Sequence, residues 1–262
     1  MIWNRFWNDM RKYFPFARYS ARSDLKAEVA SSYLNWLWWI LNPLMFMLVY
    51  SFIAVIIFQS KVQYFPVFVF IGLTIWDFTS RVIQTSVKAM RNNSSIVTKV
   101  YLPKYVLIIR MMLNQGFKML ISFVLVVIMM LLYRVPVTWR VVFLIPVFAE
   151  VILFTFGVSC IVMHFGVFID DLHNVVQIIL RIIFYMSGIF YQIDGRIDEP
   201  YRTMLLYCNP ALSLIESARR CLLYSSMPYF GPMAVWAVIS ILLCFVGVHV
   251  VYKYENSYVK IM

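Results

Sequence analysis

Long apolar segments alternate with shorter polar segments along this chain. Six of them run for about 20 residues, the length that a helix needs to cross the hydrocarbon core of a bilayer. We predict helices, because lipid offers exposed backbone groups no hydrogen-bond partners. The predicted spans are Leu34–Phe58, Phe65–Thr85, Leu113–Tyr133, Val141–Phe168, Val175–Ile193 and Pro232–Tyr252. The pattern predicts an all-α membrane protein with six transmembrane helices over residues 34–252.

The polar segments differ in charge. Residues 1–33, the connection between the second and third spans, and the tail at 253–262 hold most of the Lys and Arg residues. Loops rich in Lys and Arg stay on the cytoplasmic side, so both termini are predicted to lie inside. The same bias explains the net charge of +11 without a nucleic-acid partner, because basic residues also face the anionic inner leaflet.

Composition supports a protein whose solvent is lipid. The chain is 63% hydrophobic and 13% charged, whereas soluble domains average about 45–50% apolar and about 25% charged residues. None of the eight glycines forms a nucleotide-binding G-x-x-x-x-G-K-[ST] motif. Cysteine and histidine lack metal-ligand spacing, so we expect no metal. Cys208 and Cys221 share one extramembrane segment, and a disulfide between them is left open.

Two polar segments have amphipathic patterns. In the N-terminal segment an apolar stripe predicts a helix on the inner membrane surface; it comprises Trp3, Phe6, Trp7, Met10 and Phe14. In the long connection at 194–231, apolar spacing predicts a helix that lies in or dips into the outer interface; it rests on Leu212, Ile215, Leu222 and Leu223. Glu216 and Arg220 are four residues apart there and are predicted to pair.

Several polar or aromatic residues fall within or beside the predicted spans. Asp77 and Arg81 share one helix face and are read as a packing pair in preference to a proton relay. Glu150 lies near the middle of the fourth span, either protonated or facing a polar pathway. The tryptophans at the start of the first span are read as an interfacial belt; the alternative is that aromatic side chains line a conduit, where they stack on sugar rings.

The stretch Arg91 to Lys104, RNNSSIVTKVYLPK, interrupts the apolar chain with a polar segment of helical pattern. Asn and Ser residues offer caps at its start, and Pro103 stops the helix. We predict a helix of about two turns, roughly 10 Å long, with one apolar face formed by Ile96, Val97, Val100 and Tyr101. That face either docks on a partner protein or rests on the membrane or the neighbouring span.

Four segments in order carry a family resemblance. They are RSDLKAEVASSYLNWLWWILNPL at 22–44, FPVFVFIGLTIW at 65–76, VYLP at 100–103, and the region from Gly166 through QIILRIIFYMSGIFY to Asn209-Pro210. This order resembles the membrane subunits of ABC-2 type exporters of surface polysaccharides, which include O-antigen, capsule and teichoic acid permeases. The chain departs from the family pattern at Asn35 for Gly, Asp170 for Arg, and Gly188 for Pro, where a softer kink is expected.

The resemblance implies a transport permease that is not itself an enzyme. It implies a bacterial cytoplasmic (inner) membrane location, a second copy of the chain, two copies of a separate ATP-binding subunit that holds ATP and Mg²⁺, and a lipid-linked glycan as substrate. This chain itself is expected to bind no cofactor. The segment at about 92–103 is then a coupling helix that docks on the ATPase, and the connection at 194–231 is an outer gate of short re-entrant helices.

The resemblance also assigns candidate residues. The ATPase-coupling residues are Ser95, Ile96, Val97, Lys99, Val100, Tyr101 and Pro103. The N-terminal interface residues are Arg22, Asp24, Leu25 and Lys26. Candidates for the conduit or gate are Trp38, Trp76, Tyr191, Tyr207, Glu216 and Arg220. Two other hypotheses remain: an ABC-2 exporter of small hydrophobic molecules such as drugs or peptides, and a membrane protein outside the ABC class, such as a channel or a transferase.

Overall fold

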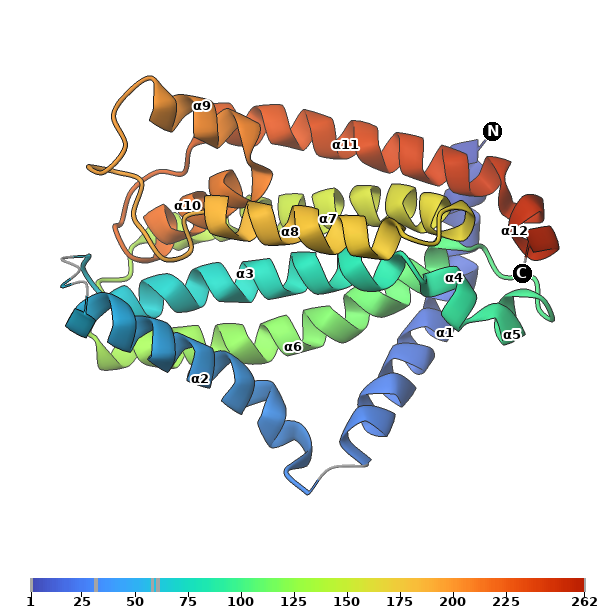
Figure 1. Cartoon of the computed structure of the whole chain (residues 1–262), viewed down its shortest axis with the longest axis horizontal. Helices are drawn as coiled ribbons and strands as arrows, with labels where there is room; N and C mark the ends of the chain where they lie inside the picture. Colours follow the sequence, from blue (N-terminus) through green and yellow to red (C-terminus); the bar gives the residue numbers. More distant parts are fainter. Residues whose placement is uncertain (1, 31–32, 58, 60–61, 262) are drawn as a thin grey trace.

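The computed structural model describes residues 2–30, 33–57, 59 and 62–261, and its long helices run side by side (Figure 1). The helices are α1 (Ile2–Ala30), α2 (Trp38–Phe52), α3 (Phe65–Ser86), α4 (Ala89–Asn92), α5 (Ser94–Val97), α6 (Tyr105–Leu132), α7 (Leu144–Phe168), α8 (Leu172–Met186), α9 (Tyr201–Cys208), α10 (Pro210–Leu222), α11 (Phe230–Lys253) and α12 (Glu255–Ile261). Short turns η1 (Asn35–Leu37) and η3 (Trp139–Phe143) precede α2 and α7, and η2 (Ile53–Ile57) extends α2.

Among the described residues, five helical segments are long and apolar enough to cross a membrane, and they match five of the six predicted spans. They run over Trp38–Ile56, Phe65–Ser86, Tyr105–Leu132, Trp139–Phe168 and Phe230–Lys253. The all-α membrane fold is therefore confirmed. Phe58, the last residue of the first predicted span, lies outside the described residues.

Helix α8 covers the predicted fifth span in part, because it has 15 residues and ends at Met186. Gly188 follows with a φ of 64°, a left-handed conformation that ends a helix. The softer kink expected at this point is wrong, since the helix stops here. The number of six spans stays a prediction.

Helix α3 is the centre of the bundle. It contacts α2, α6, α7, α8 and α10, and residues on all its sides are buried over its first half, from Phe65 to Trp76. Apolar side chains all round a helix are the pattern of a helix enclosed by its neighbours. The few α3 side chains that are not buried therefore stand out from the rest of the helix, and they lie at the site described below.

Helices α7 and α11 form the most extensive contact in the fold. Small residues bring the two backbones together: a Cβ on Gly157 would lie 2.8 Å from the backbone of α11, and one on Gly247 would lie 2.7 Å from the Cβ of Cys160. Without a hydrophobic force between helices in lipid, such close packing supplies van der Waals stabilisation.

The two ends of the bundle have different structures. Both termini, α4, α5 and α12 lie at one end, where α1 runs across the bundle (Figure 1). The end of α2 and the start of α3, together with α9 and α10, lie at the other end. We call these the terminal end and the loop end. Their separation agrees with the predicted placement of both termini on one side.

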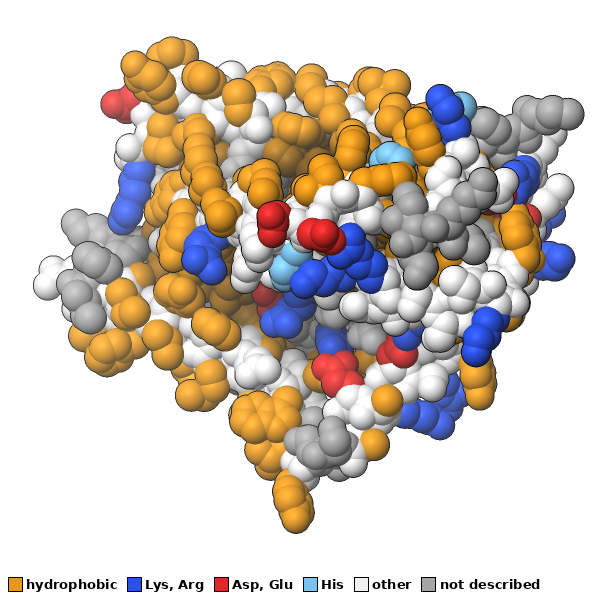
Figure 2. Space-filling model, turned by 45° about the vertical axis from the view of Figure 1, so that its right-hand side comes forward, with side chains coloured by type: hydrophobic (Ala, Val, Ile, Leu, Met, Phe, Trp, Pro, Cys, Tyr) orange, Lys and Arg blue, Asp and Glu red, His pale blue; other side chains and the backbone are white. Residues whose placement is uncertain are grey.

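The surface follows the same division. Figure 2 shows hydrophobic side chains over most of the visible bundle and Lys and Arg side chains gathered toward the terminal end. An apolar belt with charge at its edge is the surface that a bilayer accommodates.

Helix α1 modifies the prediction of a single apolar stripe. Phe6 is buried and Met10 is half-buried against the bundle, whereas Trp7 is 59% and Phe14 43% exposed. The small residues Ala17 and Ala21 let the middle of the helix pack closely on its neighbours. The stripe is thus divided between the protein and the surface of the molecule; the side chain of Trp3 is outside the described set.

Candidate functional site

A cavity of about 460 Å³ lies between α2, α3, α6 and α8. Its polar lining comes from all four helices and from the last turns of α1; it includes Glu28, Asn42, Thr74, Asp77, Ser80, Arg81, Gln84, Gln115, Lys118, Ser122, Gln177, Arg181 and Tyr185. Polar side chains at membrane depth are costly unless they face protein or water. Their convergence on one space defines the candidate site.

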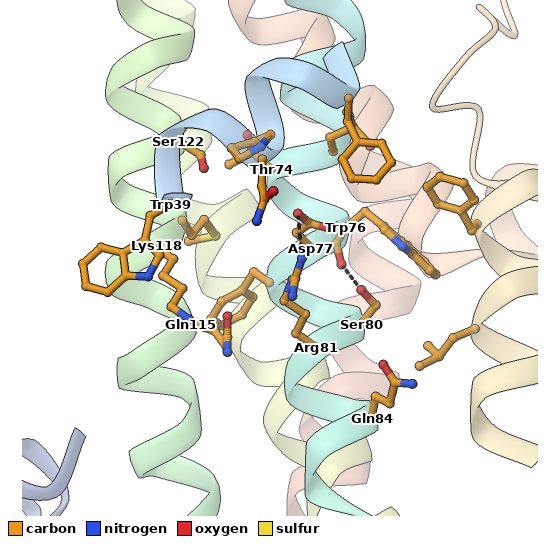
Figure 3. A pocket seen from close by; sticks show the side chains of 18 of the residues that line it. Trp39, Thr74, Trp76, Asp77, Ser80, Arg81, Gln84, Gln115, Lys118 and Ser122 are labelled. Atoms are coloured by element: carbon orange, nitrogen blue, oxygen red, sulfur yellow. Dashed lines mark hydrogen bonds and ion pairs between the residues drawn. The ribbon is translucent and has the colours of Figure 1, made fainter. Parts of the chain in front are cut away.

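Helix α3 presents its polar stripe to this cavity. Asp77 and Arg81 form an ion pair at 3.8 Å, with 45% and 56% of their side chains exposed. Figure 3 shows both residues beside the hydroxyl of Ser80, which donates to the carbonyl of Trp76 at 2.7 Å. The predicted pairing of Asp77 with Arg81 is confirmed, and the pair faces the cavity.

Helix α6 supplies a second polar stripe, formed by Gln115, Lys118 and Ser122 (Figure 3). The Lys118 ammonium donates to both carboxylate oxygens of Glu28 at 2.7 Å. It also lies 5.7 Å from the centre of the Trp39 ring, within cation–π range. Lys118 therefore joins α1, α2 and α6 at the cavity rim.

Aromatic rings from α2, α3 and α8 form much of the apolar wall, and Phe190 packs behind two of them. Trp76 of α3 contacts Phe184 of α8, with ring centres 5.6 Å apart. Phe184 contacts Phe190 at 5.3 Å, and Phe190 contacts Tyr50 of α2 at 4.0 Å. Aromatic faces beside polar groups bind molecules that have both apolar C–H faces and hydroxyl groups.

The structure separates the predicted conduit and gate residues. Trp38 and Trp76 line the cavity. Tyr191 lies just beyond it and donates to the carbonyl of Tyr185, a lining residue, at 3.5 Å. Tyr207, Glu216 and Arg220 belong to α9 and α10 at the loop end. The cavity and the loop-end helices are therefore distinct parts of the molecule.

The predicted pairing of Glu216 with Arg220 is wrong. Glu216 pairs with Arg219 at 2.5 Å, and both side chains are almost completely buried. Arg220 extends from another face of α10, and its guanidinium lies 3.4 Å from Asp194. The physical reason is that α10 packs between α3 and α7 on its Arg219 face, which a spacing rule for surface pairs does not consider.

Arg219 is the main residue that sequence reasoning missed. Its guanidinium donates to the carbonyls of Phe68 at 3.0 Å, Gly188 at 2.7 Å and Ile189 at 3.0 Å. Its charge also lies over the Phe68 ring, 3.4 Å from the ring centre. One buried side chain thus joins α10, α3 and the chain just after α8.

Two glycines make room for this arrangement. A Cβ on Gly72 would lie 2.7 Å from the Arg219 guanidinium, and one on Gly188 would touch Leu212 at 2.8 Å. The carbonyls just after a helix end need donors, and Arg219 provides them. Burial raises the pKa of Glu216, while the neighbouring guanidinium opposes that shift.

Asp194 organises the exposed side of the loop end. It accepts from Arg202 at 3.2 Å and from the Tyr229 hydroxyl at 2.8 Å, in addition to its contact with Arg220. Burial and the hydrogen bond to Asp194 raise the pKa of Tyr229 to about 12.

Cys208 and Cys221, the two cysteines of this connection, are both free thiols. The first is exposed and the second is buried, so they do not form the disulfide that the sequence leaves open.

The segment at 91–104 differs from the predicted helix of two turns. Its helical part is one turn, α5 at Ser94–Val97, preceded by the single turn α4. Asn93 makes no cap through its side chain; it donates to Ala89 at 2.7 Å and accepts from Arg110 at 2.9 Å. The cap was predicted from residue type alone, whereas the asparagine is engaged by another helix.

The predicted apolar face of this segment is divided as well. Val97 is buried, whereas Val100 and Tyr101 are 59% and 55% exposed. Ser95 and Lys99 are exposed and Pro103 is buried. Lys104 is buried, its ammonium donates to the carbonyl of Val97 at 3.5 Å, and burial lowers its pKa.

Ion pairs attach this segment to its neighbours. Arg91 pairs with Asp170 and donates to the carbonyl of Val167 at the end of α7.

Among the predicted N-terminal interface residues, Asp24 of α1 accepts two hydrogen bonds from Arg110 of α6, at 2.5 and 2.6 Å. Of the other predicted N-terminal interface residues, Arg22 and Lys26 are exposed and Leu25 is half-buried; Ser32, in the same motif, lies outside the described residues.

Glu150 lies in the second turn of α7, away from the cavity lining. Its side chain is buried, and one carboxylate oxygen has no hydrogen-bond partner among the described residues. The sequence left two alternatives for Glu150: a protonated side chain, or a side chain that faces a polar pathway. Glu150 does not line the cavity, so the cavity is not that pathway.

The fold and the cavity define a class: a multi-pass, all-α membrane protein with a polar and aromatic cavity among its helices. No family model matches the chain. It is similar to the O-antigen export system permease protein RfbA of Myxococcus xanthus, at 28% identity over 84% of this chain and 85% of the relative. Two such permeases of Klebsiella pneumoniae are 28% and 25% identical, each over 91% of this chain and 92% of the relative. These similarities support the resemblance to ABC-2 type polysaccharide export permeases.

Proposed function

We propose that this chain is the membrane-spanning permease subunit of an ATP-driven exporter of a surface polysaccharide. The observation that carries the proposal is the cavity in which polar stripes of α3 and α6 face an aromatic wall. A glycan needs both surfaces, because its rings have apolar C–H faces and polar hydroxyls. The similarity to O-antigen export permeases over most of the chain supports this choice of substrate class.

The energy source is proposed to be a separate ATP-binding subunit in two copies, which holds ATP and Mg²⁺. The exposed Val100 and Tyr101 offer it a small apolar contact at the terminal end. The terminal end then faces the cytoplasm of a bacterial cell, and the loop end faces outward. The basic character of the terminal end supports this orientation.

A second copy of the chain is proposed to complete the conduit. The cavity has α2 and α8 at its edges, and these helices keep large apolar side chains exposed, including Phe46 and Val49 on α2 and Ile178 and Ile182 on α8. Closing such edges with the same edges of another copy gives a symmetric interface, the commonest arrangement of homo-oligomers. A lipid-linked glycan would then lie between the two subunits, with its lipid in the bilayer.

The proposal is tested by deletion and by purification. Deletion of the gene is expected to remove the surface polysaccharide while its lipid-linked precursor accumulates inside the cell, and the purified chain is expected to carry an ABC-type ATPase. Complementation with the full chain is the control. Intact surface glycan together with an absence of bound ATPase would contradict the proposal. Resistance to small hydrophobic compounds that depends on the chain, without a glycan defect, would identify the other class of exporter.

A further inference from the structure

Helix α1 makes charged contacts along most of its length, and three of them lead to parts of the proposed transport path. Arg5, in its first turns, reaches the exposed segment at 91–104. Asp24, near its other end, reaches the same segment through α6. Glu28, one turn further, reaches the cavity rim. The three contacts therefore form one continuous route.

The first contact joins three elements. The Arg5 guanidinium donates to the Tyr101 hydroxyl at 2.5 Å and to the Glu255 carboxylate of α12 at 2.7 Å. Its charge also lies 4.5 Å from the centre of the Tyr252 ring. A planar guanidinium held by several partners is fixed in orientation, so Tyr101 is held to α1 at a defined position.

The second contact lies about 28 Å further along α1, from 19 residues at 1.5 Å each. The Asp24 carboxylate accepts both bonds from Arg110, at 2.5 and 2.6 Å, and Arg110 also donates to Asn93 at 2.9 Å. Two-pronged pairs of this kind are short and directional. The segment at 91–104 is thus fastened to α1 near both of its own ends.

The third contact is at the cavity. Glu28 holds the Lys118 ammonium through both carboxylate oxygens, and Glu28 and Lys118 both line the cavity. After Ala30 the chain continues into α2, which begins at Trp38 and contributes Trp38 and Tyr50 to the aromatic wall. A displacement of α1 therefore changes the cavity rim directly and the α2 wall through the chain.

We infer that α1 transmits movement of the segment at 91–104 to the cavity, with Arg5 and Asp24 as positioning residues and the Glu28–Lys118 pair as the contact that responds. The inference rests on the proposed function, in which that segment contacts the ATPase. Helices α3 and α6 also connect the segment to the cavity, but they are joined to it through the backbone. Helix α1 supplies a route through side chains alone, so point substitutions can interrupt it.

The test uses the full permease in complex with its ATPase. Asp24→Asn removes the charge and keeps the shape. Glu28→Gln does the same in a pair whose carboxylate partner is exposed, so folding depends little on the contact. Arg18→Gln is the control, because it removes a charge from an exposed position of α1. Each variant is measured for ATP hydrolysis, as phosphate release, and for polysaccharide reaching the surface of the host strain.

A second readout does not need the glycan. Gln115→Cys, in the cavity, is labelled with a water-soluble maleimide in a Cys208→Ser background, with and without ATP and vanadate. We expect a labelling rate that depends on nucleotide in the otherwise unaltered complex and with Arg18→Gln. With Asp24→Asn or Glu28→Gln, both this difference and the glycan exported per ATP are expected to fall about fivefold, a typical coupling between contacting residues.

Three results would overturn the inference. Unchanged labelling and unchanged export per ATP in Asp24→Asn and Glu28→Gln would show that α1 transmits nothing. Loss of the ATPase or a lower melting temperature in both variants would assign these residues to folding. Absence of any export that depends on ATP in the unaltered complex would reject the proposed function itself, and the inference with it.

Discussion

Single residues at the loop end show how environment changes the role of a charge. Arg219 and Arg220 are adjacent in sequence, but one is completely buried on three carbonyls and the other contacts Asp194. Removing one partner of a buried pair leaves an uncompensated charge, whereas replacing both with apolar residues avoids that cost. The two arginines should therefore respond differently to substitution.

Glu216→Leu leaves Arg219 buried without its counter-ion and should lower the free energy of unfolding by about 3–5 kcal/mol. The double variant Glu216→Leu with Arg219→Met should recover much of that loss, although the carbonyls of Gly188 and Ile189 lose their donor. Arg220→Met breaks a half-buried pair with Asp194, whose partners keep contact with solvent, and should cost only about 1 kcal/mol. Unfolding by SDS titration measures all three. Equal losses in Glu216→Leu and Arg220→Met would contradict the assigned roles.

Close helix contacts give a second prediction at this scale. A Cβ added at Gly247 would already lie 2.7 Å from the Cβ of Cys160, and valine adds two more carbon atoms. Gly247→Val should therefore destabilise the α7–α11 contact by about 1–3 kcal/mol. The neighbouring Val246 is exposed, and Val246→Leu is the matched control. Melting temperatures in detergent measure the difference, and equal values for the two variants would show that the contact is looser than described.

At the scale of elements, the segment at 91–104 is a set of short turns stabilised by other helices. One turn of helix is not stable alone, because the entropy lost in ordering the first turn exceeds the stabilisation from its single hydrogen bond. Arg110 and Arg5 fix the two sides of the segment, and Val97 and Leu102 anchor it in the core. What remains exposed is the small apolar surface of Val100 and Tyr101.

Val100→Asp should leave membrane insertion and the melting temperature unchanged, because Val100 is exposed and makes little contribution to the core. In the complex it buries an unpaired carboxylate against the proposed ATPase, so export should fall about tenfold or more while basal ATP hydrolysis continues. Val137→Asp, an exposed valine beyond α6, is the control. Normal export by Val100→Asp would reject this contact.

At the scale of the whole molecule, the arrangement of α2 and α8 decides how the cavity can be used. Both helices keep wide apolar faces exposed next to a polar cavity. Lipid would cover these faces but would leave polar groups close to hydrocarbon, which is unfavourable. A second copy that covers the same edges would enclose the cavity in protein.

Ile182→Trp should disrupt this interface, because a packed contact does not tolerate added volume. Leu242→Trp is the matched control: Leu242 is similarly exposed on α11, and lipid accommodates a larger apolar side chain. The mass of the complex in detergent, by light scattering, should fall to that of a single copy for Ile182→Trp alone. Equal masses for both variants would contradict an interface at α8.

The sequence alone determined the all-α membrane fold, the positions of five long helices, the pairing of Asp77 with Arg81 and the resemblance to export permeases. These follow from local signals: apolar length, charge placement and helical spacing. Only the tertiary structure showed that Arg219 is buried, that Asn93 bonds to Arg110, that α8 ends at Met186, and that Trp38 and Trp76 share a cavity that Tyr207 does not reach. The reason is that burial and contact depend on which helices become neighbours, and periodicity in one segment carries no information about the segment that will pack against it.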